Sequence, residues 1–183
     1  MAGSFYIARF LFAFSGVSID SLYLKGTITF EVIMFTHPPV PPGGPTARFG
    51  QNIPFEAFGF CDGSVKRRTG SCGSVLLGVN GETLAQSSRV LTGAVLDSNE
   101  VEFQGLLDVL SAASLLKLRS LWVGIDCFEV IAHTLKASSR YAQYLDALNG
   151  LVREFEGLTL QAISRTHNKR ADALARIGIR NVR

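Results

Sequence analysis

The hydrophobic and polar positions follow clear periods from Phe55 onward. Residues 55–61 and 71–79 alternate loosely as strands, and residues 83–90 form a third strand, which predicts an antiparallel meander. Asn80-Gly81 precedes the third strand and predicts a two-residue hairpin, because both central positions of a type I′ turn need a positive φ.

A helical period follows the meander. Apolar residues recur at three- and four-residue spacing over residues 103–113, which predicts a helix with one face packed on the sheet. Asp97 and Glu100 match a capping box, so we expect this helix to start near Ser98. Glu102 then falls in the first turn or so, pointing out beside the helix N-terminus.

The remaining pattern predicts two further strands and three further helices. The expected strands are residues 120–125 and 158–165, and the expected helices are residues 128–136, 141–156 and 169–177. The resulting order is β-β-β-α-β-α-α-β-α, which is typical of an α/β domain with parallel strands joined by helical crossovers.

Residues 1–50 differ from the rest of the chain. Their start is apolar and aromatic without a clear period, and HPPVPPGGPTARFG, residues 37–50, is rich in residues that break regular structure. We therefore expect an N-terminal extension and Pro/Gly linker over residues 1–50 and a folded domain over residues 55–183. The extension is open to three interpretations: an accessory segment, a targeting region or a fragment of a larger polyprotein.

Length and charge allow several kinds of function. The 183 residues, of 19.8 kDa, suffice for one domain plus an extension, and the net charge of +3 permits an anionic partner without requiring one. Basic residues form two clusters, one after Asp62 and one near the C-terminus: Lys66, Arg67 and Arg68, then Arg165, Lys169, Arg170, Arg176, Arg180 and Arg183. They indicate phosphate contacts, with a solubilising surface as the alternative.

Cysteine usage and hydropathy bear on location. The three cysteines are an odd number without metal-finger spacing, which favours a reducing, intracellular compartment and a role as core filler. Cys61 and Cys127 each adjoin an aspartate and should point away from its carboxylate. No apolar run has the roughly 18 residues that a membrane span requires, so we expect no membrane partner.

Four acidic residues stand where predicted elements begin or end: Asp62 closing the first strand, Glu102 early in a helix, Asp126 closing another strand and Asp172 opening the last helix. If the strands that end at Asp62 and Asp126 are parallel neighbours, both carboxylates emerge at one sheet edge. Clustered carboxylates repel one another unless a cation lies between them, and hard divalent cations such as Mg²⁺ prefer oxygen ligands.

Each acid also has an ordinary explanation as a turn residue, a helix cap or a solvated position. Four of them in this arrangement favour a site for two metal ions, about 3.5 to 4 Å apart, that hydrolyses a phosphodiester.

Four segments together resemble type 1 ribonuclease H, in particular the reverse-transcriptase-like branch found in plant genomes and retroelements. They are CDGSVKRRTGSCGSVLL, SNEVEFQGLLDVL, LWVGIDCFEVI and SRTHNKRADALARIG, within about residues 57–178. The resemblance implies a ribonuclease H-like fold with a five-stranded mixed sheet flanked by helices. It also implies a monomeric endonuclease that cleaves the RNA strand of RNA–DNA hybrids with two Mg²⁺ or Mn²⁺ ions.

The resemblance also assigns roles to residues. Asp62 resembles the ligand shared by both ions, Glu102 and Asp126 resemble further ligands, and Asp172 resembles a ligand of the second ion. Asn99 resembles the amide that reads the minor groove and a ribose 2′-hydroxyl. Further nucleic-acid contacts are expected from Gly63, Ser64, Lys66, Ser98, Arg165 and Asn168.

Two departures from the family pattern leave other functions open. Ser98 stands where many members have a second amide, and the histidine that assists catalysis in some members is not matched in kind. Arg165 and His167 are the available substitutes, although the pattern favours an ordinary loop residue at His167. The alternatives to an active nuclease are a nucleic-acid-binding module without turnover and an inert retroelement fragment. The segments SNEVEF and NKRADALA are not typical of integrases or junction nucleases, so these other classes with a related fold are disfavoured.

Overall fold

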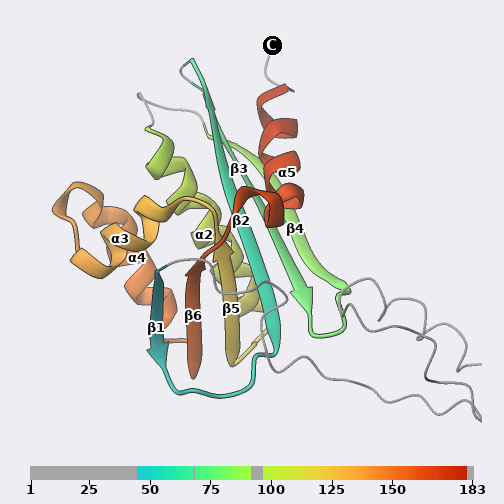
Figure 1. Ribbon diagram of the computed structural model, residues 1–183, viewed down its shortest axis with the longest axis vertical. Coiled ribbons are helices and arrows are strands. Elements are labelled where there is room, and N and C mark those ends of the chain that lie inside the picture. The colour runs from blue at the N-terminus through green and yellow to red at the C-terminus, as the bar shows by residue number, and fades with distance from the viewer. Residues whose placement is uncertain (1–44, 68, 92–96, 181–183) are drawn as a thin grey trace, which may run out of the picture.

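The computed structural model describes residues 45–67, 69–91 and 97–180. These residues form one six-stranded sheet with helices on both faces (Figure 1). The expected N-terminal extension up to residue 44, and the basic residues Arg68 and Arg183, lie outside the described residues.

The strand order across the sheet is β1-β6-β5-β2-β3-β4. The β2–β5 and β5–β6 pairs are parallel and the other pairs are antiparallel. The elements, in chain order, are β1 (Thr46–Gly50), β2 (Ala57–Lys66), β3 (Thr69–Gly78), β4 (Thr83–Leu91), α2 (Ser98–Leu115), β5 (Ser120–Ile125), α3 (Phe128–Lys136), the 3₁₀ turn η2 (Ser139–Tyr141), α4 (Ala142–Val152), β6 (Gly157–Ala162), the 3₁₀ turn η3 (Arg165–His167) and α5 (Lys169–Arg180).

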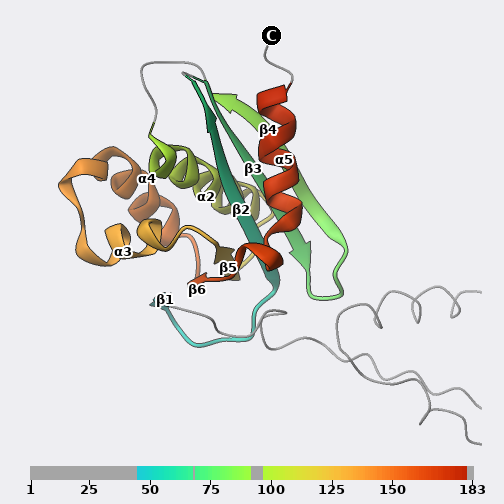
Figure 2. The ribbon, with the colours of Figure 1, turned by 45° about the horizontal axis from the view of Figure 1, so that its top comes forward.

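The helices form two layers. Helices α2, α3 and α4 lie on one face of the sheet and α5 lies on the other (Figure 2). Each face has its own hydrophobic cluster: one includes Phe103 and Leu121 beneath α2, and the other includes Trp122 and Ala171 beside α5. Within the described ranges, no helix is both long enough and apolar enough to cross a membrane.

The α/β class, the mixed sheet and the order of the predicted elements are confirmed, and a sixth strand is added. Strand β1 comes from the end of the stretch expected to be a linker, and it pairs with β6 from Thr46 opposite Gln161 to Gly50 opposite Gly157. Ala47 is buried in the main core and Phe49 packs against it. The strand forms because of this distant partner, which local sequence periodicity does not reveal.

The β3–β4 hairpin is confirmed, but its expected type I′ turn is wrong. The Gly78 carbonyl accepts from Gly81 N at 2.9 Å, so Val79 and Asn80 are the central residues of the turn. Gly81 has a φ of +82°, whereas Asn80 is not among the described residues with positive φ. This is a three-residue loop in which a glycine in the left-handed region follows the turn.

The start of α2 is confirmed. Asp97 is the N-cap: its carboxylate accepts from Glu100 N at 2.9 Å, and the Glu100 side chain accepts from Asp97 N at 3.0 Å. This reciprocal capping box satisfies two backbone donors that a helix start leaves unpaired. It thereby determines where Glu102, a few residues further on, meets the sheet.

The two faces of β1 give a test of its place in the sheet. Ala47 is 1% exposed and Arg48 is exposed, so the same new side chain should act differently at the two positions. We expect Ala47→Gln to lower the free energy of unfolding by about 1 to 3 kcal/mol, because it overpacks the core and buries an amide. Arg48→Gln should stay within about 0.5 kcal/mol of the parent in urea unfolding. Equal effects would contradict the assignment of β1.

Candidate metal centre

Asp62 and Asp126 come from neighbouring parallel strands. Strands β2 and β5 pair in parallel up to Cys61 opposite Ile125, and each of these residues directly precedes one aspartate. The expectation that the two carboxylates meet at one edge is therefore correct. The expectation that Asp62 closes its strand is wrong, because β2 continues to Lys66 by pairing with β3 after β5 has ended.

Glu102 reaches the same place from α2, which lies very close to β2. A Cβ atom at Gly63 would be 2.8 Å from the Glu102 backbone nitrogen, so only glycine allows this approach. The Glu102 side chain is buried, with the residue 6% exposed. It therefore points into the junction between helix and sheet, not outward beside the helix N-terminus as expected.

Three carboxylates form the centre of the site. Asp62, Glu102 and Asp126 each offer one oxygen, and these three oxygens lie within 4.8 Å of one another. Asp62 Oδ1 and Glu102 Oε2 are buried and have no hydrogen-bond partner. Buried polar atoms are nearly always paired in folded proteins. Three carboxylates this close together, two of which keep an unpaired buried oxygen, fit a hard divalent cation.

Burial and the charges of neighbouring carboxylates raise the pKa values of Glu102 and Asp62. The pKa of Glu102 is raised to about 9, first by burial and then by the charges of Asp62 and Asp126. The pKa of Asp62 is raised to about 7, first by burial and then by the charge of Asp126. The folded, metal-free protein therefore holds protons in this cluster that the unfolded chain would release.

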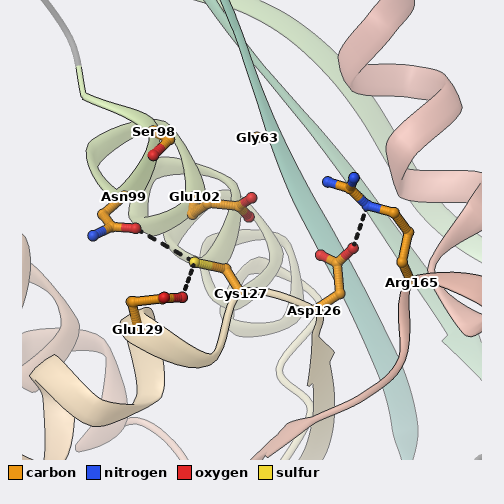
Figure 3. A pocket seen from close by; sticks show the side chains of 8 residues that line it. All are labelled: Gly63, Ser98, Asn99, Glu102, Asp126, Cys127, Glu129 and Arg165. Carbon is orange, nitrogen blue, oxygen red and sulfur yellow. Dashed lines mark hydrogen bonds and ion pairs between the residues drawn. The ribbon is translucent and has the colours of Figure 1, made fainter.

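Asp126 is oriented by two side chains that precede α5. Arg165 Nε lies 3.3 Å from Asp126 Oδ2, and the arginine side chain is 74% exposed (Figure 3). Asn168, 1% exposed, donates from Nδ2 to Asp126 Oδ1 at 3.0 Å and to the Cys61 carbonyl at 2.7 Å. Asn168 is thus a buried support of the cluster, whereas Arg165 covers it from the solvent side.

Asp172, the fourth predicted acid, stands apart from this group of three. It lies in the first turn of α5, and its Oδ1 accepts from Arg176 Nε at 2.9 Å. Its charge still contributes to raising the pKa of Asp62, after burial and the charge of Asp126. The structure therefore brings three predicted ligands together and leaves the fourth nearby, paired with a base.

A pocket opens over the carboxylates. Of the residues predicted to contact nucleic acid, it contains four: Gly63, Ser98, Asn99 and Arg165. Ser64 and Lys66 lie further along β2, outside this lining. His167 is exposed on η3, where its Nδ1 lies 2.7 Å from Ser164 Oγ, and it does not line the pocket either.

Two further pocket residues are not among the predicted site residues. Cys127 and Glu129 line the wall opposite Arg165 (Figure 3). Cys127 was expected to be core filler, yet its Sγ lies 3.4 Å from Asn99 Oδ1 and 3.5 Å from Glu129 Oε2. The one sequence signal for both residues is that they lie within three positions after Asp126.

Comparisons with known proteins agree with this architecture. The model of a family described as reverse transcriptase-like matches residues 60–178. No curated protein matches the chain.

Solved structures of ribonuclease H domains share the fold. Ribonuclease H1 from the halophilic archaeon Halobacterium salinarum is 20% identical, with a TM-score of 0.63, over 69% of this chain and 98% of that one. The N-terminal ribonuclease H domain of a Mycobacterium tuberculosis protein is also 20% identical, with a TM-score of 0.63, over 69% and 94%. LC11 ribonuclease H1, isolated from compost by a metagenomic approach and solved with an RNA/DNA hybrid, is 19% identical, with a TM-score of 0.60, over 68% and 96%.

The raised pKa values predict how the stability of the metal-free protein depends on pH. A carboxyl whose folded pKa lies above its unfolded value binds more protons when folded, so its contribution to stability is lost as pH rises. For Glu102 this window runs from its ordinary value of 4.5 to about 9. In a chelator, we expect the free energy of urea unfolding to fall between about pH 5 and pH 8.

Glu102→Gln should flatten that fall, because the amide does not titrate. Glu129→Gln is the matched control, since Glu129 is an exposed acid in the same pocket. If the two variants keep the same pH slope as the parent, Glu102 does not titrate as a buried acid.

Proposed function

We propose a function from the premise that the chain belongs to the reverse transcriptase-like family: it is a divalent-metal-dependent nuclease that hydrolyses the RNA strand of RNA–DNA hybrids. The observation that carries the proposal is the group of three carboxylates, Asp62, Glu102 and Asp126, whose ligand oxygens lie within 4.8 Å of one another. Burying acids that have two unpaired oxygens lowers the stability of the fold. Such a cluster therefore indicates a site for a cation.

Mg²⁺ or Mn²⁺ would be held by these three acids, and Asp172 would become available to a second ion if it left Arg176. Bound divalent ions would lower the pKa of the attacking water and stabilise the negative charge on the leaving oxygen. The chain's own residues hold the carboxylates in place for this chemistry. Asn168 keeps Asp126 oriented through its bond to Oδ1 at 3.0 Å.

Arg165 would change partner when a cation takes over the carboxylates. Its guanidinium faces Asp126, and its side chain is mostly exposed at the mouth of the pocket. Released from Asp126, it would offer a planar, permanently charged group to a backbone phosphate. We propose it in place of His167, which does not line the pocket, as the basic group that assists at the site.

Recognition of a hybrid is proposed from the residues around the acids. Asn99 lies on the pocket wall, where it would read a ribose 2′-hydroxyl, and Lys66 on β2 would contact a phosphate. Gly63 lets the strand and α2 come close to each other at the edge of the site. The structure of LC11 ribonuclease H1 with an RNA/DNA hybrid gives this substrate class a precedent on the same fold.

A nucleic-acid-binding module without turnover is the second candidate. The observation that favours it is the ion pair between Asp172 and Arg176 at 2.9 Å, which withholds the fourth acid. In that case a hybrid would bind in a chelator as well as in Mg²⁺, and neither condition would give cleavage.

The first test is cleavage of a labelled RNA–DNA hybrid by the full chain in Mg²⁺ and in Mn²⁺. We expect cleavage of the RNA strand that a chelator abolishes, and Asp62→Asn should reduce the rate by at least about 10²-fold, the size of effect that removal of one preorganised electrostatic group has in an active site.

Asp146→Asn makes the same chemical change on the exposed surface of α4 and should leave the rate unchanged. A hybrid left intact by the parent, or cut equally by Asp62→Asn, would refute the proposed activity.

Metal binding has a second readout that needs no substrate. A cation that binds only the folded state stabilises it in proportion to the logarithm of its concentration. We expect Mg²⁺ to raise the melting temperature of the parent at neutral pH, and to raise that of Glu102→Gln much less. Equal shifts in both proteins would show that the cation binds elsewhere.

A further inference from the structure

A hydrogen-bonded chain fixes the Asn99 side chain from both sides. Its Nδ2 donates to Tyr141 Oη at 3.1 Å, and its Oδ1 accepts from Cys127 Sγ at 3.4 Å, a thiol that shares its single proton with Glu129 Oε2 at 3.5 Å. Asn99 is in the first turn of α2, Cys127 follows β5, and Tyr141 ends η2. Three separate segments thus converge on one amide at the pocket wall, and Figure 3 shows two of the side chains involved, Asn99 and Cys127.

The series of hydrogen bonds continues from Tyr141 away from the pocket and ends at Asp97. The Tyr141 hydroxyl donates to Asp97 Oδ2 at 3.1 Å, and Arg140 Nη2 lies 2.8 Å from the same oxygen. Asp97 is also the N-cap of α2. The Tyr141 ring is 1% exposed and lies 5.3 Å from the Phe103 ring and 4.5 Å from the His133 ring, so it has little freedom to move.

The amide keeps part of its bonding capacity. An asparagine side chain offers two N–H donors and two acceptor lone pairs. Among the described residues, Tyr141 and Cys127 take one of each, which leaves one donor and one acceptor on this pocket-lining amide. A ribose 2′-hydroxyl both donates and accepts, and therefore matches that remainder.

We infer that Tyr141 and Cys127 are positioning residues that hold Asn99 ready to distinguish RNA from DNA. The inference deepens the proposed function and rests on it. An asparagine near a helix start would otherwise sample several rotamers, and ordering such a side chain on binding costs affinity. Here the ordering is completed during folding, so binding of the 2′-hydroxyl does not incur that cost.

Tyr141→Phe tests the inference because it removes the hydroxyl and keeps the packed ring. Tyr144→Phe is the matched control: the Tyr144 ring stacks on Phe103 at 5.7 Å, and among the described residues it is not part of the chain to Asn99. Both are made with Asp62→Asn, so that the substrate is not cleaved. Dissociation constants are measured in Mg²⁺ for an RNA–DNA hybrid and a DNA duplex of one sequence.

We expect Tyr141→Phe to weaken hybrid binding roughly 2- to 10-fold and to leave binding of the DNA duplex unchanged. Cys127→Ala should act in the same direction, and Tyr144→Phe should change neither constant. Asn99→Ala should by itself remove the preference for the hybrid. Combined with it, Tyr141→Phe should have no further effect on either dissociation constant, because it acts through that amide.

If Tyr141→Phe binds both duplexes as Tyr144→Phe does, the inference is overturned and the proposed function is unaffected. Equal weakening of both duplexes would also overturn it, since that is the result of a general structural role. A parent that binds hybrid and DNA duplex equally would instead overturn the proposed substrate, and the inference with it.

Discussion

The burial of three carboxylates in one small space is the constraint on which the rest of the site depends. Asp62 and Glu102 are almost completely buried, and each has an oxygen without a hydrogen-bond partner. Their raised pKa values mean that the fold disfavours the charged carboxylates. Protonation or a bound cation would relieve that unfavourable free energy. An arrangement of this kind opposes stability and is therefore best explained by what it binds.

The surrounding structure holds the acids together against their repulsion. The parallel pairing of β2 with β5 brings two of them to one edge, and the close approach of α2 over Gly63 brings the third. Asn168 and Arg165 partly satisfy Asp126, but neither reaches the orphaned oxygens of the other two acids by a hydrogen bond within the described part of the chain. Asp97 contributes in two ways. As the N-cap it starts α2, the helix that carries Glu102, and its carboxylate also anchors the hydrogen bonds that run through Tyr141 to Asn99.

What could be predicted from the sequence was local or periodic. The capping box predicted the start of α2 correctly. The positions of the four acids, together with the expected crossover, predicted a cluster that three of them form. Strand β1 was missed because it depends on a partner more than a hundred residues away, and the hairpin turn was misassigned because Asn-Gly also fits a turn in which the glycine alone is left-handed. The bonds from Cys127 and Tyr141 to Asn99 join three separate segments, and no local pattern encodes them.

The buried carboxylate site is tested by the number of protons released when Mg²⁺ binds at neutral pH. This number is measured by isothermal titration calorimetry in buffers of different ionisation enthalpy. Because the pKa of Glu102 is raised to about 9, that carboxyl is protonated in the metal-free protein and must lose its proton to become a ligand. We expect a net release of protons from the parent and a smaller release from Glu102→Gln. Binding of Mg²⁺ without proton release, or the same release from Glu102→Gln, would contradict it.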